Sequence, residues 1–497
     1  MFKSVHDSLR FLKQGKNWVL ILFCTIYCLI SLVNHYNFRT YAFDLGIYNN
    51  CLFQYGHFHK NHYPYLHYMF NNFLADHFSL YTVVLSPLYY IFGTYTLLYI
   101  QILSVLFGAF GIYKIVQSRY DHHYLPEIAM IHYLSFFGIY SALSFDYHDN
   151  TVSAMLVPWF IYYFNLNKIK WAVVFAILIV IGKENMPIWL SFVCAGLFLL
   201  NYKDKKKRNM ALILSIACLV YVITIIKVVM PALDDNMAEN GYNAFQYRVL
   251  GSNPSEILSN LIHHPSTIFK ALFYSHIPQY PELNDIKKEL YICLLYSGGF
   301  MLFVKPQYLI MLIPIIAQKV LSDDFGKWGI NNHYSIEFAP IIVICFYDGI
   351  SYFKNKKIVY VSAVLICIST ALVTYYKIKK RHSIYYNEIN VNIYTKEHYK
   401  SEFNRKEVAR VMNLIPPNAN VSALNMFCPH LSFRKNIYQF PDIHDAEYIM
   451  LANSKSSYPL RGAVLADQIR DYLASPLWET VSADKGIYLF KKLKSLN

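Results

Sequence analysis

Long apolar runs separated by short polar segments dominate the chain. A helix needs roughly 20 apolar residues to cross the hydrocarbon core of a bilayer. The pattern therefore predicts a polytopic α-helical membrane protein with about 11 transmembrane helices, within a range of 10–13. The predicted spans are 18–36, 94–117, 125–143, 151–166, 170–186, 187–202, 209–230, 289–304, 306–321, 336–352 and 358–376.

Two stretches leave the number of spans open. The apolar run 170–202 fits either two helices or one kinked span. The run 79–92 is shorter and fits either a twelfth span or a partial, interfacial helix.

The pattern changes after residue 376, where polar residues become frequent. Residues 401–413 have the apolar spacing of a helix, and IPPNANVSALN, NIYQFP and EYIMLA read as a turn followed by short strands. WETVSADKGIYLFKK reads as a hairpin turning at Asp484–Gly486. We therefore expect a membrane domain over 1–376 and a small extramembrane α/β domain over 377–497.

Composition supports this class of fold. The chain is 55% hydrophobic and 15% charged, against about 25% charged in soluble proteins. The formal net charge of +14 comes largely from short basic runs between apolar segments, which excludes a nucleic-acid-binding function. Nine scattered cysteines show neither metal-ligand spacing nor a disulfide framework.

Basic residues in short loops predict the orientation, because such loops stay in the cytoplasm. The N-terminus is then cytoplasmic and its first span is an uncleaved anchor. The predicted outside segments are the first loop 37–93, 144–150, the region near Lys183, a long loop 231–288, 322–335 and the C-terminal domain. The basic segments assigned to the cytoplasm are Lys3–Lys16, Arg119, 167–170, Lys203–Arg208, Lys305 and Lys354–Lys357.

The first outside loop contains Asp44 in FDLGIYNN and Asp76–His77 in LADHFSLY. A carboxylate at a membrane–water boundary can serve as a general base, and an adjacent imidazole can help to bind a cation or a phosphate. Each aspartate also precedes an apolar run, so each fits a helix N-cap equally well. Both interpretations stay open from these residues alone.

Two further outside clusters carry ionisable side chains. SFDYHDN places Asp146, His148 and Asp149 between two spans, which are more charged groups than one helix cap requires. Lys183 and Glu184 interrupt an apolar stretch, and adjacent helical residues point about 100° apart, so other partners are expected for both. Mutual neutralisation is the alternative.

Two outside loops supply the remaining candidates. Arg248 lies in the long loop, where it could contact a phosphate, and His333 lies in NNHYSIEF just before a span. His333 and Tyr334 also fit the interfacial anchors that commonly flank a span.

In order along the chain, FDLGIYNN, LADHFSLYTVVLSPLYYIF, SFDYHDNTVSAMLVP, IGKENMPIWL and NNHYSIEFAP resemble motifs of a bacterial family of predicted membrane proteins, domain of unknown function 2079. That family is similar to GT-C type glycosyltransferases, which use polyprenyl-phosphate sugars. The resemblance covers about 35–350 and extends to the C-terminal segment.

The resemblance implies a GT-C-like fold in a bacterial inner (cytoplasmic) membrane and transfer of a sugar from a polyprenyl-phosphate carrier to an extracytoplasmic acceptor. It assigns catalysis to Asp44 and Asp76. The resemblance does not settle the roles of the other polar residues. Our hypothesis is that substrate is bound by His77, His148, Lys183, Glu184, Arg248 and His333. The chain lacks the double-acid triplet of many metal-dependent members, so a divalent cation, Mg²⁺ or Mn²⁺, held by Asp146 and Asp149 is an option rather than a requirement.

Two other functions fit the same residues. A non-enzymatic transporter or flippase of a lipid-linked or envelope polymer could line its passage with these clusters, and an envelope scaffold could bind a partner through the C-terminal domain. The expected partners are a polyprenyl-phosphate-linked sugar and membrane lipid, with no nucleic acid. The oligomeric state is not predicted.

Overall fold

The computed structural model describes residues 14–66, 69–235, 246–277, 283–383 and 386–493, so Lys3, Arg10 and Lys13 lie outside the described residues. The chain divides into two compact units. Unit 1 comprises Met1–Ile30, Ile100–Val229 and Asn240–Asn392, and unit 2 comprises Ser31–Tyr99, Met230–Glu239 and Ile393–Asn497. The division into a membrane domain ending at 376 and a separate tail stays a prediction.

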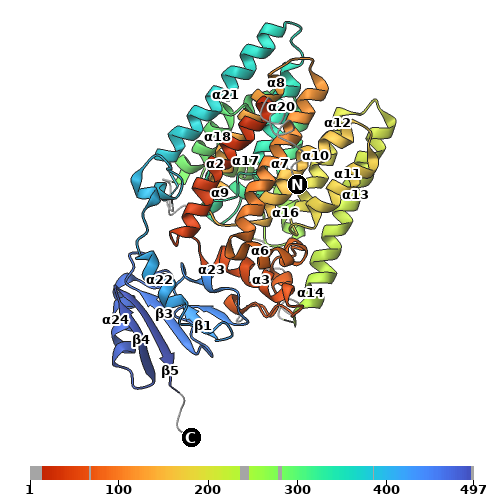
Figure 1. The fold of residues 1–497 in the computed structure, drawn as a ribbon. Coiled ribbons are helices and arrows are strands. Elements are labelled where there is room, and N and C mark those ends of the chain that lie inside the picture. Colours follow the sequence, from red (N-terminus) through yellow and green to blue (C-terminus); the bar gives the residue numbers. More distant parts are fainter. Residues whose placement is uncertain (1–13, 67–68, 236–245, 278–282, 384–385, 494–497) are drawn as a thin grey trace. The chain divides into compact units, whose positions relative to one another are not determined.

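Unit 1 is a bundle of helices (Figure 1). Within it α12 packs against both α13 and α19, α10 packs against α11, and α8 packs against α21. The first helix of the bundle begins in unit 1 and ends in unit 2, and α7 begins in unit 2 and continues in unit 1. The helices are α2 (Gly15–Tyr36), α7 (Thr96–Arg119), α8 (Leu125–Leu134), α9 (Phe137–Leu143), α10 (Asp149–Asn165), α11 (Ile169–Val180), α12 (Met186–Leu200), α13 (Lys205–Thr224), α16 (Pro254–His263), α17 (Pro265–Phe273), α18 (Asn284–Tyr296), α19 (Pro306–Val320), α20 (Phe338–Ile350) and α21 (Lys356–Lys379).

Each of the eleven predicted spans coincides with one or two of these helices. The run 170–202 forms two helices, α11 and α12, and not one kinked span. Among the described residues, four helical segments are long and apolar enough to cross a membrane, and four shorter apolar helices accompany them. The long segments are Gly15–Tyr36, Ser86–Arg119, Lys205–Leu233 and Lys356–Lys379. The membrane class is therefore confirmed, and the number of eleven spans stays a prediction.

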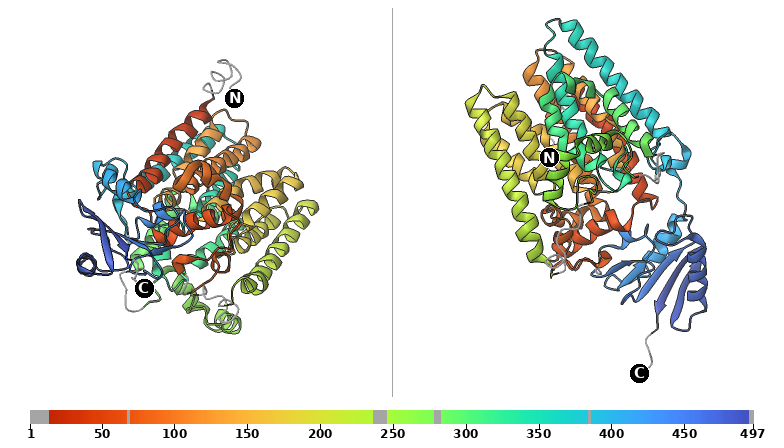
Figure 2. Two further views of the ribbon diagram at one scale, coloured as in Figure 1. Left: turned by 60° about the horizontal axis from the view of Figure 1, so that its bottom comes forward. Right: turned by 180° about the vertical axis from the view of Figure 1, so that it is seen from behind.

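The face of α13 shows why these helices require lipid. Ile213, Val220 and Ile223 are 58–65% exposed on it, and the helix lies at the edge of unit 1 in each view (Figure 2). A continuous apolar surface of this kind is rare in water and is stable against acyl chains. The sequence of α13 thus suits a helix that is surrounded by lipid acyl chains and not one that is buried in a protein core.

The ends of the unit 1 helices form two groups. Arg119 and Lys305 both pair with the carboxylate of Asp348, at 3.0 and 3.1 Å. The sequence predicts that the loops with Arg119 and Lys305 are cytoplasmic. The segments with Lys183 and His333, which are predicted to lie outside, meet at a single polar cavity. The grouping agrees with alternating crossings of the membrane. Which group faces the cytoplasm remains a prediction.

Unit 2 contains a five-stranded sheet with the strand order β2-β1-β3-β5-β4. The strands β1 (Val421–Ala423), β2 (Ile437–Gln439) and β3 (Tyr448–Ala452) are parallel, whereas β5 (Ile487–Lys492) runs antiparallel between β3 and β4 (Trp478–Asp484). The predicted hairpin is confirmed, with Lys485 and Gly486 at φ +50° and +74° in its turn. α22 (Arg405–Met412) and α24 (Gly462–Ala474) pack on β5 and β4, respectively.

Much of the rest of unit 2 comes from the first predicted outside loop. It contains a π-helical turn η1 (Ala42–Gly46), α3 (Ile47–Gly56) and the short helices α4 (Phe73–Asp76), α5 (Tyr81–Val84) and α6 (Tyr89–Phe92). The run 79–92 is thus a series of short helical pieces, of which 86–92 continue into α7. Two further short helices, α14 (Met230–Leu233) and α23 (Cys428–Leu431), also belong to unit 2.

Candidate functional site

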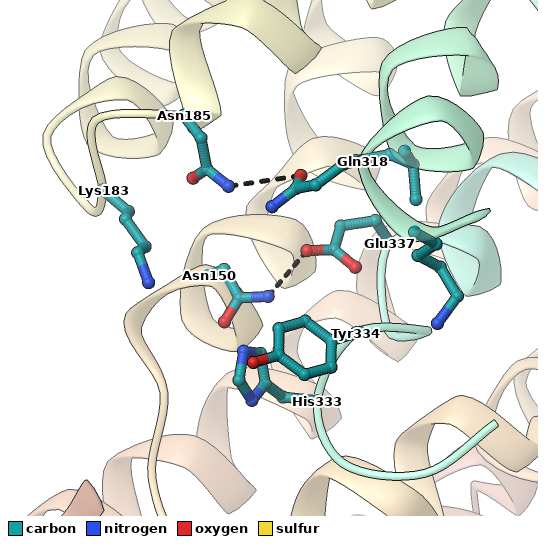
Figure 3. Close-up of a pocket in the computed structure, with 9 residues that line it drawn as sticks. Asn150, Lys183, Asn185, Gln318, His333, Tyr334 and Glu337 are labelled. Atoms are coloured by element: carbon teal, nitrogen blue, oxygen red, sulfur yellow. Dashed lines mark hydrogen bonds between the residues drawn. The ribbon is translucent and has the colours of Figure 1, made fainter. Parts of the chain in front are cut away.

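A polar cavity, partly open to solvent, lies in unit 1. It sits where four segments meet: the start of α10, the α11–α12 loop, the end of α19 and the loop before α20 (Figure 3). Two of the predicted binding residues, Lys183 and His333, line it. The complete lining is Asn150, Lys183, Asn185, Ile315, Gln318, Lys319, His333, Tyr334 and Glu337.

Three helices begin at this cavity. The N-cap of α10 is His148, that of α12 is Asn185 and that of α20 is Glu337, and none of the three makes a side-chain cap hydrogen bond. Helix N-termini carry a partial positive charge and free N–H donors, which makes them suited to anions. Three such ends at one polar cavity favour a ligand with negative charge.

Lys183 adds a full positive charge to the cavity. Its side chain is half-buried and forms no ion pair with any described residue. Burial lowers the pKa of the neighbouring Lys327, the carboxylate of Asp324 raises it, and the positive charge of Lys183 lowers it further. Two ammonium groups that repel one another in a half-buried place would both gain from a bound anion.

The opposite wall pairs an amide with a carboxylate. Asn150 Nδ2 donates to Glu337 Oε1 over 2.6 Å, and both residues are only 4% exposed. Asn150 Oδ1 and Glu337 Oε2 have no hydrogen-bond partner among the described residues. Buried polar atoms are normally hydrogen-bonded, so this pair has capacity for a ligand with hydroxyl groups. Asn185 and Gln318 form a second, longer amide pair at 3.4 Å.

Lys319 has a largely structural role. Its buried ammonium donates to the carbonyl oxygens of Lys327 and Gly329, each over 2.8 Å. These two bonds hold the 322–335 loop against the end of α19. One ammonium N–H remains for a ligand in the cavity.

The predicted residue His333 lines the cavity, and the predicted residue His148 lies against His333 without lining the cavity. Their rings stack with centroids 3.5 Å apart, and Phe145 stacks on His148 at 5.2 Å. The backbone N–H of His148 donates to Gln101 Oε1 over 3.0 Å, which fixes the turn before α10. On α9, a Cβ atom at Gly138 would collide with the backbone carbonyl of Ser335, so glycine there allows the His333 loop to approach.

Asp146, Asp149 and Glu184 are buried close to the cavity without lining it. Asp146 adopts a positive φ of 47°, and its carbonyl oxygen accepts from Gln101 Nε2. Asp149 is the first residue of α10 and accepts from Tyr147 over 2.6 Å. Within the described ranges, no group of three or more histidine, cysteine or acidic residues is placed to hold a metal ion. A cation at Asp146 and Asp149 therefore stays a prediction.

Arg248 lies beside the cavity segments and not in the lining. Its backbone N–H donates to the carboxylate of Asp323, its guanidinium lies 3.8 Å from that carboxylate, and its side chain is 94% exposed. An exposed side chain of this kind can reach a ligand only by changing its partner. Phosphate binding by Arg248 stays a prediction.

In unit 2, Asp44 lies inside η1 and is half-buried. The N-cap of η1 is Tyr41, so the interpretation of Asp44 as a helix N-cap is wrong. The carboxylate instead lies in the first turn of a helical segment, where the helix dipole stabilises negative charge. Asp44 is thus an ionisable group in a π-helical turn, a geometry found often at functional sites.

The C-terminal part of the chain holds the Asp44 segment in place within unit 2. The N–H of Ala42 donates to Asn425 Oδ1 over 2.8 Å. On α3, Asn49 Nδ2 donates to Pro429 O over 3.2 Å and Asn50 Nδ2 donates to Arg434 O over 2.9 Å. The two asparagines of FDLGIYNN are therefore structural, because their buried amides satisfy main-chain carbonyls of the C-terminal domain.

Asp76 and His77 form a contact of their own. Asp76 is the last residue of α4, whose N-cap is Asn72, so the interpretation of Asp76 as an N-cap is wrong. Its carboxylate accepts from the hydroxyl of the buried Tyr63 over 2.7 Å and lies 3.9 Å from His77 Nδ1. A carboxylate that contacts a tyrosine hydroxyl and an imidazole can act as a general acid or base. It can also stabilise the fold by linking α4 to the segment that carries Tyr63.

The sequence interpretation missed part of the cavity. Lys319 and Glu337 are ionisable residues inside predicted spans, and this is the signal that could have revealed them. Asn150, Asn185 and Gln318 are neutral, so no charge marks them in the sequence. Their importance follows only from their meeting in space.

Comparison with known proteins identifies the family. A family model described as predicted membrane protein, DUF2079, matches residues 34–485. The chain belongs to this family. No curated protein matches the chain.

Two solved structures resemble this member of the DUF2079 family, and both are of the GT-C type. ArnT from Cupriavidus metallidurans in the apo state has a TM-score of 0.51 at 11% identity, over 96% of this chain and 98% of that chain. The Archaeoglobus fulgidus oligosaccharyltransferase, tethered to an acceptor peptide containing the NVT sequon, has a TM-score of 0.44 at 12% identity, over 97% and 74%. The likeness to ArnT shows the fold, and it confirms the expected resemblance to GT-C proteins.

Proposed function

We propose that this protein is an integral-membrane glycosyltransferase that transfers a sugar from a polyprenyl-phosphate carrier to an extracytoplasmic acceptor. The observation that carries the proposal is the cavity of unit 1, where an anion is favoured by three helix N-termini without a side-chain cap hydrogen bond and by Lys183, which forms no ion pair with a described residue. The GT-C-type fold supports it. A sugar phosphate offers both the negative charge and the hydroxyl groups that this lining can bind.

In this proposal the donor phosphate binds Lys183 and the N-termini of α10 and α12. Asn150 and Glu337 bind sugar hydroxyls through their unused oxygen atoms. As the sugar leaves, negative charge grows on the phosphate oxygen, so a fixed ammonium near it stabilises the transition state. Arg248 would also bind the phosphate, once its guanidinium exchanges the carboxylate of Asp323 for the phosphate oxygens.

Asp44 is the proposed base. An acceptor hydroxyl or amine attacks the anomeric carbon, the bond from that carbon to the phosphate oxygen breaks, and Asp44 takes the acceptor's proton. A single displacement of this kind inverts the configuration at the anomeric carbon. Asp76 and His77 would assist the acceptor or the leaving phosphate. Asp146 and Asp149 would hold a divalent cation if the reaction uses one.

The experiment tests Asp44 directly. Purified protein is reconstituted with a lipid extract from a strain that lacks it, and lipid-linked sugars are followed by mass spectrometry. The wild-type protein should consume one such species, and Asp44→Asn should lose at least 100-fold in rate. Asp121→Asn, in an exposed loop, is the matched control and should retain the rate. Full activity of the Asp44 variant would refute the assignment.

A further inference from the structure

Two amphipathic helices in the long predicted outside loop carry large apolar side chains that are exposed. Leu258 and Ile262 on α16 are 61% and 62% exposed, and Phe269 on α17 is 63% exposed. On α16 these residues share a face with Leu261, whereas Glu256 and His263 lie on the opposite side. The pair lies at the margin of unit 1 (Figure 2, left).

Both helices have well-defined starts, so their exposure is not that of a frayed segment. Asn253 caps α16 by accepting from the N–H of Glu256 over 2.9 Å, and Glu256 in turn accepts from the N–H of Ser252 over 2.8 Å. This is a capping arrangement of the kind that fixes a helix start. α17 begins with Pro265, which suits the first helical turn.

Hydrogen bonds fix the position of α17 relative to the predicted span 289–304. The buried ammonium of Lys287 donates to Ala271 O over 2.5 Å and to Tyr274 O over 2.9 Å. The hydroxyl of Tyr291 donates to Leu272 O over 2.8 Å. Both donors lie on α18 where its apolar run begins, so α17 ends at the level where the chain is expected to enter the membrane.

The chain before α16 is also fixed near the predicted outer boundary of the membrane. Tyr247 donates to Gln318 O over 3.5 Å, and the N–H of Arg248 donates to Asp323, both at the end of the predicted span 306–321. Between these two anchors, α16 and α17 have little freedom to leave the boundary. Their apolar side chains are thus presented where lipid, and not bulk water, is available.

We propose that α16 and α17 form an interfacial helix pair that inserts Leu258, Ile262 and Phe269 into the outer boundary of the lipid acyl chains. Amphipathic helices with this distribution bind membrane interfaces in proportion to the apolar area that they bury. The polar edge carries His263, His264 and Lys270, which suit anionic headgroups. Phe273 of α17 is exposed and contacts Tyr291 of α18, with ring centroids 5.3 Å apart, and Ile292 and Leu295 of α18 are exposed as well. The apolar surface of α17 therefore leads to that of a predicted span, so lipid is its occupant.

The proposal is tested with the full-length protein in vesicles of phosphatidylethanolamine and phosphatidylglycerol. The photoreactive residue benzoylphenylalanine is introduced singly at Leu258, Ile262 or Phe269. Thr267, which is exposed and lies on the side of α17 opposite Phe269, is the matched control. After irradiation, intact-protein mass spectrometry measures the adduct with one phospholipid.

We expect at least tenfold more phospholipid adduct from the three apolar positions than from the Thr267 position. Equal adducts on both faces, or adducts only with a second protein molecule, would overturn the proposal. Because three positions on two helices are used, poor folding of one variant does not decide the result. The outcome is independent of the proposed transferase activity.

Discussion

The imidazole rings of His148 and His333 stack with their centroids 3.5 Å apart. One ring precedes α10 and the other precedes α20, so the contact joins two helix starts that are far apart in the sequence. Both helix starts open onto the polar cavity. The contact therefore ties the two sides of the cavity together.

A double-mutant cycle should detect this contact. His148→Ala and His333→Ala should each destabilise the protein, and their coupling energy should be about 0.5–1.5 kcal/mol because stacked ring pairs contribute that much beyond their buried area. The measurement is thermal or denaturant unfolding in detergent. A cycle of His148 with His122, from a different loop, should give less than about 0.5 kcal/mol. Equal coupling in both cycles would contradict the stacked arrangement.

Lys183→Gln should weaken binding of the carrier lipid. Hydrogen bonds to charged groups contribute about 1.5–3 kcal/mol, so the Kd for a short-chain polyprenyl phosphate should rise roughly 10–100-fold. Native mass spectrometry of the detergent-solubilised protein measures this Kd. Lys170→Gln, on an exposed residue at the other end of α11, should leave the Kd unchanged. If both variants bind like the wild type, the cavity does not hold the phosphate.

Asn425→Ala should slow transfer without weakening donor binding. The change removes the acceptor that holds the N–H of Ala42, two residues before Asp44. We expect about a tenfold fall in kcat with an unchanged donor KM, because a misplaced base costs rate and not affinity. Asn425→Asp keeps an acceptor oxygen and should restore most of kcat. A loss that Asn425→Asp does not restore would indicate general misfolding of unit 2.

His430 should make unit 2 less stable in acid. Burial lowers the pKa of His430 from 6.5 to about 4, although a hydrogen bond with the backbone of His35 opposes the shift. Between pH 6.5 and 4 the unfolded chain binds a proton that the folded chain does not. The stability is therefore complete above pH 6.5 and falls as the pH drops toward 4, by at most about 3 kcal/mol.

The variant His430→Phe tests this pH dependence. A phenylalanine ring preserves the stacking with His35, whose centroid lies 4.0 Å away, but cannot titrate. Unfolding transitions from pH 4 to 7 should be flatter for this variant than for the wild type. His59→Phe, which replaces an exposed histidine of unit 2, should keep the wild-type slope. An unchanged slope in His430→Phe would show that His430 does not contribute.

Local signals in the sequence predicted much of the fold. Apolar runs marked the helices of unit 1, and the sequence Asp484–Lys485–Gly486 marked the β4–β5 hairpin because glycine and its neighbour adopt positive φ there. α24 was not predicted, although its apolar residues have helical spacing. The apolar signal is weak there, because only Leu465 and Ile469 of this helix are buried.

The candidate site was predicted only in part. Lys183, His148 and His333 were found because charged or aromatic polar residues stand out at the ends of apolar runs. The pairing of Asn150 with Glu337 could not be predicted, because it depends on how α10 packs beside α20. The same holds for Asn49 and Asn50, whose carbonyl partners lie in the C-terminal domain.

The most direct test of the transferase proposal compares lipid-linked and envelope glycans, by mass spectrometry, in a wild-type strain and a strain lacking the protein. A transferase predicts that one polyprenyl-phosphate sugar accumulates in the deletion strain while one sugar disappears from an envelope glycan. Both changes should be reversed by the wild-type gene and not by Asp44→Asn. Identical glycan and lipid profiles in the two strains would contradict the proposed function.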